Sequence, residues 1–84
     1  MPQVRITEEA LDQIATLPLR LQVRLESIID RLEKWPEVSG AKPLRGDLKG
    51  CYRIRTGDYR VVFAAADDIV TIMKVSHRKN VYED

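Results

Sequence analysis

The stretch that decides the fold covers residues 51–60 and reads CYRIRTGDYR. A Gly-Asp pair between two alternating runs predicts a β-hairpin whose two-residue turn lies at 57–58. This turn sets Arg55 directly opposite Arg60 on one face of a sheet, with Arg53 two residues along the same face. Like charges in that arrangement destabilise a sheet by a few tenths to about 1 kcal/mol. We therefore expect the face to bind an anionic ligand.

The runs that flank this turn separate into two faces, which predicts a sheet with one buried side. The apolar face carries Tyr52, Ile54, Val61 and Phe63, and the other carries Arg53, Arg55, Arg60 and Val62. We expect strands over residues 51–56, 59–65 and 69–77.

The turn before the last strand allows two registers. A two-residue turn at 67–68 sets Lys74 opposite Val61 in the core, whereas a three-residue turn that begins at Ala66 sets Lys74 opposite Arg60. Burying an unpaired lysine costs free energy, so we predict the three-residue turn. That register carries Lys74 and Arg78 onto the basic face and Val75 into the core.

The first half of the chain predicts one strand and two helices. Residues 3–6 alternate as a short strand does, and Thr7 can cap a helix with the apolar stripe Leu11, Ile14 and Leu17. A second helix is expected over 19–34, where apolar residues recur at helical spacing and Trp35-Pro36 ends the pattern. Its stripe consists of Leu21, Leu25, Ile28, Leu32 and Trp35.

The expected fold class is α+β in the order β-α-α-β-β-β, with the helix hairpin packed on one face of a small, mainly antiparallel, four-stranded sheet. At 84 residues the chain is expected to form a single domain, 1–84. No run approaches the roughly 20 apolar residues of a membrane span. Cys51 is the only cysteine, no signal peptide opens the chain, and we expect a cytoplasmic protein without a membrane partner.

Charge divides unevenly along the chain although the formal net charge is only +1. Residues 1–41 carry five Lys/Arg against seven Asp/Glu, or −2, and residues 42–79 carry nine against four, or +5. This asymmetry is typical of proteins that bind nucleic acid or another polyanion, and is also found on solvated faces. The loop at 37–50 adds Lys42, Arg45 and Lys49, whose spacing suits successive phosphates as well as plain solvation.

Cleavage of RNA without a metal requires activation of a 2′-hydroxyl, stabilisation of a phosphorane and protonation of the leaving 5′-oxygen. Guanidinium groups suit the second task because they bind phosphate oxygens in pairs and stay protonated. The candidates for proton transfer are His77 and Tyr82, with Lys74 and Lys49 added because a cationic surround favours a neutral amine. Alternation places His77 on the face opposite Arg78, where a structural role competes with a catalytic one.

Neither a metal-ligand cluster nor a phosphate-binding glycine loop is present in the sequence, so no metal and no cofactor are expected. Four motifs instead follow in a fixed order: KPLRG at 42–46, GCYRIR at 50–55, GDYRVVF at 57–63 and HRKNVY at 77–82. Together with the order of elements, this set resembles the RelE/ParE toxin superfamily of bacterial and archaeal toxin-antitoxin modules. The resemblance covers nearly the whole chain.

The resemblance implies a function as well as a fold. RelE-like toxins cut mRNA in the ribosomal A site, ParE-like toxins poison DNA gyrase, and the ending His-Arg-x-x-Val-Tyr is similar to the RelE branch. The implied partners are a cognate antitoxin, the ribosome and mRNA, with the toxin-antitoxin complex binding operator DNA through the antitoxin. The implied catalytic residues are Arg53, Arg55, Arg60, Arg78 and Tyr82. Candidate RNA-binding residues are Lys42, Arg45, Lys49, Lys74, His77 and Lys79.

This sequence has arginine at 53 and 55, where the best-known members of the RelE branch have lysine. Arginine does not readily donate or accept a proton, so proton transfer is expected to fall to Tyr82, His77 or another group. Three hypotheses follow: a ribosome-dependent endoribonuclease, a non-enzymatic gyrase inhibitor, and a protein that binds an antitoxin but has lost toxicity.

Overall fold

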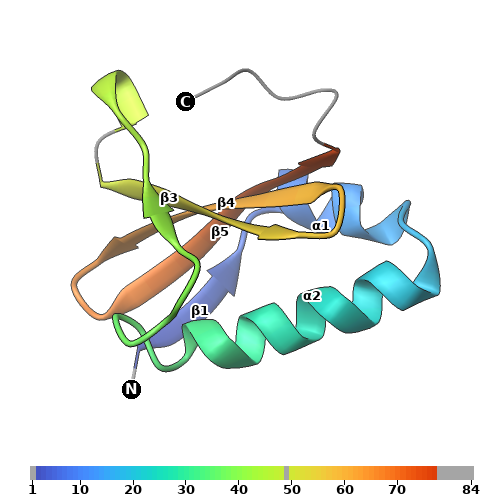
Figure 1. Cartoon of the computed structure of the whole chain (residues 1–84), viewed down its shortest axis with the longest axis horizontal. Coiled ribbons are helices and arrows are strands. Elements are labelled where there is room, and N and C mark those ends of the chain that lie inside the picture. Colours follow the sequence, from blue (N-terminus) through green and yellow to red (C-terminus); the bar gives the residue numbers. More distant parts are fainter. Residues whose placement is uncertain (1, 49, 78–84) are drawn as a thin grey trace.

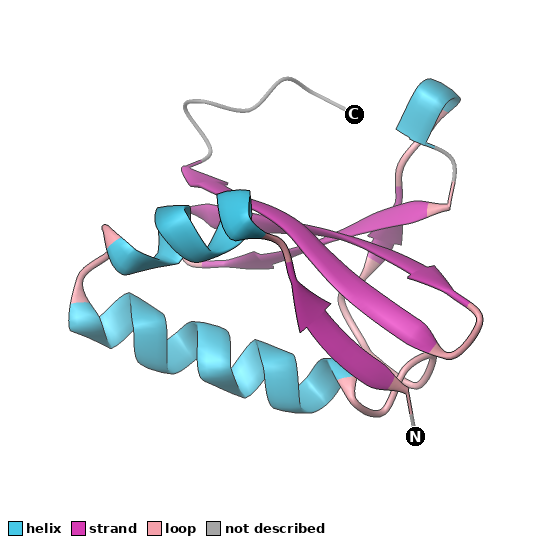
Figure 2. Cartoon of the chain, turned by 180° about the vertical axis from the view of Figure 1, so that it is seen from behind, coloured by secondary structure: helices cyan, strands magenta, loops and turns pink. Residues whose placement is uncertain are grey.

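The computed structural model describes residues 2–48 and 50–77. The elements follow one another as β1 (Gln3–Ile6), α1 (Glu8–Ala15), α2 (Leu19–Leu32), β2 (Lys42–Pro43), the 3-10 turn η1 (Gly46–Leu48), β3 (Cys51–Thr56), β4 (Tyr59–Ala66) and β5 (Ile69–His77). Both helices lie on the same side of one sheet, and within the described residues neither helix covers the other side, which we call the open face (Figures 1 and 2). This is the predicted α+β architecture.

The sheet has five strands in the order β1-β5-β4-β3-β2, one more than predicted. The additional strand is β2, in which Lys42 and Pro43 pair with Arg53 and Tyr52 inside the segment that was expected to be a loop. Only the outer pair β1 and β5 is parallel, whereas the other neighbours are antiparallel. The central hairpin therefore has a paired neighbour on each side.

Each helix carries one apolar stripe, and α1 also has a capping residue at its start. The Thr7 hydroxyl accepts a hydrogen bond of 3.2 Å from the backbone N–H of Ala10, which caps α1 as predicted. The side chain of Gln22 joins the helices, since its Nε2 donates to the carbonyl oxygens of Ile14 and Leu17 at 3.2 and 3.0 Å. The hairpin is thus fixed by polar bonds as well as by packing.

The predicted stripe of α2 is buried at its four helical positions and half-buried at Trp35, and that of α1 needs one correction. Leu21, Leu25, Ile28 and Leu32 are all buried. In α1, by contrast, Ala10 is completely buried and Leu11 is 49% exposed, because Ala10 and not Leu11 shares a helix face with Ile14 and Leu17, which pack against the core. The second helix also ends at Leu32, two residues before the predicted end.

The core lies between α2 and the inner face of the sheet. Its largest fully buried side chains are Phe63, Leu32, Ile54, Ile72, Val61 and Val70. Trp35, just after α2, packs at one end of the core. Its ring centroid lies 4.6 Å from that of Tyr52 and 5.2 Å from that of Phe63. The apolar face predicted for β3 and β4 is confirmed at Ile54, Val61 and Phe63, which are all buried.

The predicted three-residue turn between β4 and β5 is wrong. Ala66 pairs with Ile69, so the turn holds only Asp67 and Asp68, both with positive φ (52° and 64°). The register then shifts between Val62 and Phe63, where β5 contains one extra residue in a bulge. Among the described residues no helix has the length and apolar character needed to cross a membrane.

Candidate functional site

The bulge decides which side chains of β5 reach the open face. Phe63 pairs with Ile72 and Val62 with Lys74, so Met73 is the inserted residue. Lys74 consequently stands on the open face, as predicted, although opposite Val62 and not opposite Arg60. Val75 faces Val61 and is buried, which confirms its predicted place in the core.

The central hairpin has the predicted register. Thr56 pairs with Tyr59 and Arg55 with Arg60, around a turn in which Gly57 has a φ of 58°. Glycine readily adopts the left-handed backbone conformation that this position requires, whereas other residues adopt it at a cost in free energy. The two arginines are therefore held opposite each other by the turn geometry.

Basic side chains gather on the open face from every strand of the sheet. Cross-strand pairing places Lys42 beside Arg53, and the outward parity of β1 adds Arg5, whose neighbours Val4 and Ile6 pair with the buried Val70 and Ile72. We call this set the basic face. Its members are Arg5, Lys42, Arg53, Arg55, Arg60 and Lys74. None of the strand positions described in the structure is Asp or Glu, so no strand carboxylate offsets these charges.

Arg60 differs from the other cations of the basic face in its burial. It is only 8% exposed, whereas Arg53 is half-buried and Arg55, Lys42 and Lys74 are exposed. Burial restricts the rotamers of a guanidinium and strengthens its field, because less water screens it. Arg60 is thus the pre-organised cation of the face, and its exposed neighbours are adjustable ones.

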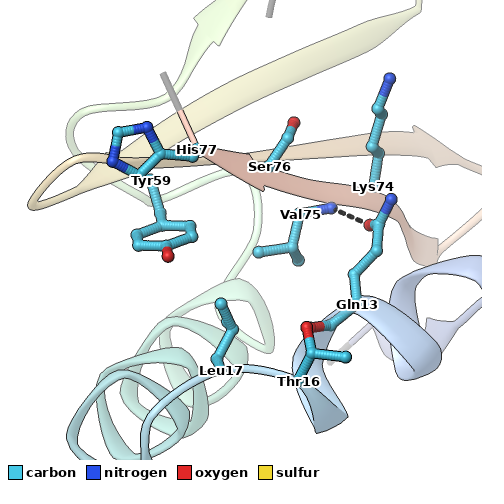
Figure 3. A pocket seen from close by; sticks show the side chains of 8 residues that line it. All are labelled: Gln13, Thr16, Leu17, Tyr59, Lys74, Val75, Ser76 and His77. Atoms are coloured by element: carbon cyan, nitrogen blue, oxygen red, sulfur yellow. Dashed lines mark hydrogen bonds between the residues drawn. The ribbon is translucent and has the colours of Figure 1, made fainter. Parts of the chain in front are cut away.

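His77 lies apart from the basic face, as alternation predicts. It pairs with Tyr59 on the helix side of the sheet, and the two rings meet edge to face with centroids 5.1 Å apart. Both residues line a hollow of about 430 Å³ between α1 and the end of β5 (Figure 3). The structure therefore gives His77 a packing role next to a cavity, and not a position among the arginines.

The remaining predicted residues have different outcomes. Arg45 is exposed between β2 and η1, close in sequence to Lys42 but outside any strand. Four of the predicted residues lie outside the described part of the chain, namely Lys49, Arg78, Lys79 and Tyr82. Among the described residues no group of three or more His, Cys, Asp or Glu side chains is arranged to hold a metal ion.

Sequence reasoning missed Arg5, Gln13 and Ser76. Arg5 could have been found from the alternation of residues 3–6, which turns Val4 and Ile6 inward and Arg5 outward. Gln13 accepts a hydrogen bond of 2.6 Å from the backbone N–H of Val75 (Figure 3), a contact that no sequence pattern indicates. Ser76 stands opposite Arg60 on the open face only because of the bulge.

Known proteins with this architecture define the class. In the crystal structure of the toxin-antitoxin complex RelBE2 from Mycobacterium tuberculosis, a chain that is 32% identical superposes with a TM-score of 0.80, over 93% of this chain and 100% of that one. The fold is therefore that of the RelE-like toxins.

Sequence comparison then gives the family. The chain is similar to Toxin RelG of M. tuberculosis (35% identity over 94% of this chain and 93% of the relative) and to Toxin RelE of the same organism (37%, over 94% and 84%). The model of the ParE toxin of type II toxin-antitoxin systems matches residues 4–82, and the chain belongs to this family within the RelE/ParE superfamily.

Proposed function

We propose that this toxin is a ribosome-dependent endoribonuclease that cleaves mRNA in the ribosomal A site and so inhibits translation. The observation that carries the proposal is the pairing of Arg55 with the buried Arg60 on a face whose described strands contain no carboxylate. A sheet that keeps this repulsive pair gains from an anion that bridges it. The relatives named RelE and RelG add support, since RelE-like toxins act on mRNA.

The chemistry is an attack of a ribose 2′-oxygen on the neighbouring phosphorus. The P–O5′ bond breaks as the P–O2′ bond forms, a base takes the 2′-proton, and an acid protonates the leaving 5′-oxygen. Arg60, together with Arg78, stabilises the additional negative charge of the phosphorane. Arg53 and Arg55 hold the message backbone and assist at the reacting phosphate. Cations fixed in this way often account for more of the rate enhancement than any other contribution.

Proton transfer is assigned to Tyr82, because a guanidinium group does not readily donate or accept a proton. Lys42, Arg45, Lys49, Lys74 and Lys79 would then contact the backbone of the message or of ribosomal RNA as further phosphate contacts. The ribosome would supply the alignment of the 2′-oxygen, so few titratable groups are needed on the toxin. Cleavage is proposed to require no metal and no cofactor.

The proposed regulator is a cognate antitoxin, since the similar M. tuberculosis structure is a toxin-antitoxin complex. The antitoxin would cover the basic face or displace the C-terminal segment, and the complex would bind operator DNA through the antitoxin in the cytoplasm. If acidic side chains cover the basic face, affinity falls as salt rises. An affinity that is independent of salt would contradict this electrostatic contact.

Inhibition of DNA gyrase by binding alone is the second candidate, because the matching family model is that of the ParE toxin. In that case the basic face would contact the gyrase-DNA complex and no bond would be cleaved. A toxin-like protein that has lost toxicity would retain antitoxin binding alone.

One experiment separates these functions. Purified protein is added to translating ribosomes, and the ends of the message are mapped by primer extension, with Arg60→Ala and Arg78→Ala as variants. Cuts spaced by codons that disappear in both variants support the nuclease. Intact message together with trapped gyrase-DNA complexes would establish the inhibitor instead, and neither effect would leave only antitoxin binding.

A further inference from the structure

The hollow of about 430 Å³ between α1 and the end of β5 has a wall that is fixed by hydrogen bonds between these elements. Strand β1 ends at Ile6, paired with Ile72, so the outer edge of β5 beyond that point meets α1 and not another strand. There the Thr7 hydroxyl donates to the carbonyl oxygen of Met73 at 3.1 Å, and Gln13 accepts from the N–H of Val75. These bonds hold the wall of the hollow in place.

The side chains that line the hollow combine flat rings with neutral hydrogen-bonding groups. Tyr59 and His77 lie at one end, Lys74 at the other, and Gln13 and Thr16 form the opposite wall (Figure 3). Of the described residues that line it, none is Asp or Glu. A nucleobase has the complementary chemistry, because its π-face packs on aromatic rings and its edge exchanges hydrogen bonds with amides and hydroxyls.

The hollow is continuous with the basic face through β5. Ser76 lines the hollow and pairs with Arg60, and Lys74, two residues earlier, pairs with Val62. Within the described part of the chain, the Ser76 hydroxyl oxygen is buried and has no hydrogen-bond partner. Buried polar atoms are normally satisfied, and this one belongs to the open face opposite Arg60, between the hollow and the arginines of β3 and β4.

We propose that this hollow receives one unpaired nucleobase of the RNA whose phosphate lies at Arg60. The proposal rests on the nuclease function above and adds to it a site that selects the base. The backbone stays on the basic face, Lys74 contacts a phosphate at the rim, and the base turns over the edge of β5 into the hollow. Gln13, Thr16 and His77 then discriminate among bases, whereas the arginines contact phosphates that all sequences share.

The direct test uses the free protein and does not depend on cleavage. Each of the four nucleoside 5′-monophosphates, and inorganic phosphate as the matched control, is titrated into labelled protein while backbone amide shifts are followed by NMR. The expected result is a shift of Thr16, Ser76 and His77 with at least one nucleotide and not with phosphate. Shifts that phosphate reproduces, or that remain confined to 53–60, would overturn the proposal.

The functional test fills the hollow. Thr16→Trp places an indole in the cavity, whereas Ala15→Trp places the same ring on an exposed neighbouring position of α1. Loss of a base contact is expected to lower kcat/KM at the preferred codon by about tenfold or more, so that the preference among codons becomes weaker. Ala15→Trp should retain the codon preference of the unmodified chain, and an equal effect of both variants would contradict base selection.

The two tests keep the two proposals apart. If the unmodified chain cuts no message but nucleotides still shift Ser76 and His77, the nuclease function fails and the base site stands. If message is cut with the same codon preference by Thr16→Trp, whose fold is verified by its amide spectrum, the base site fails and the nuclease stands.

Discussion

The two faces of the sheet are built on opposite principles. The inner face alternates apolar side chains such as Phe63 and Ile54 against α2, and every one of these contacts lowers the free energy of the folded state. The outer face gathers cations, and its Arg55–Arg60 pair raises that free energy. The contrast teaches that the inner face is explained by folding alone, whereas the cations gathered on the outer face suit an anionic ligand.

The inner face should respond to truncation with the largest loss of stability. Phe63→Ala removes a completely buried ring and leaves a cavity, which is expected to cost about 3–5 kcal/mol of unfolding free energy. Urea denaturation measures it. Leu19→Ala, at a position 75% exposed, is the control and should change stability by less than about 0.5 kcal/mol. Equal costs would mean that the core does not lie under α2.

The outer face should respond with loss of activity. Arg60→Ala removes the buried cation opposite Arg55, and cleavage of ribosome-bound message is expected to slow by about 10²–10³-fold, or about 2.7–4 kcal/mol of transition-state stabilisation. Single-turnover kinetics measure it. Arg60→Lys keeps the charge but loses the paired donors, so its rate should lie between those of the unmodified chain and Arg60→Ala. An unchanged rate in Arg60→Ala would remove this residue from the site.

The turn between β4 and β5 belongs to neither face and should affect stability alone. Asp68 has a φ of 64°, so Asp68→Gly relieves left-handed strain and is expected to add about 0.5 kcal/mol, net of the entropy of glycine. Thermal unfolding measures it, and cleavage should stay unchanged. Asp58→Gly should bring no such gain, because Asp58 does not have a positive φ.

The sequence predicted most of this arrangement because period-two alternation and the Gly-Asp turn together determine which side of the hairpin each residue occupies. The α1 stripe failed at Leu11 because Ala10, which also stands at helical spacing from Ile14 and Leu17, takes the buried position. Strand β2 was missed because two residues are too short to show alternation. In the site, Lys74 was placed on the correct face for an incorrect reason.

That error has a physical cause. The choice between two turn lengths assumed regular strands, and under that assumption only the longer turn kept Lys74 out of the core. The bulge at Met73 also keeps Lys74 out of the core, because one extra residue in β5 turns Lys74 outward after a two-residue turn. A bulge leaves no local sequence mark here, so Ser76 and the hollow beside it could not be placed from sequence.

The most direct test replaces Arg55, the exposed member of the Arg55–Arg60 pair. Unfolding free energy and cleavage are then measured in the same variant. Arg55→Thr is predicted to raise the unfolding free energy by a few tenths to about 1 kcal/mol, because Arg60 no longer faces a like charge, and to slow cleavage. Arg5→Thr, a strand arginine opposite Thr71, is the matched control and should bring no gain in stability. Loss of stability in Arg55→Thr, or unchanged cleavage, would contradict the claim that the Arg55–Arg60 pair destabilises the fold and serves to bind an anionic ligand.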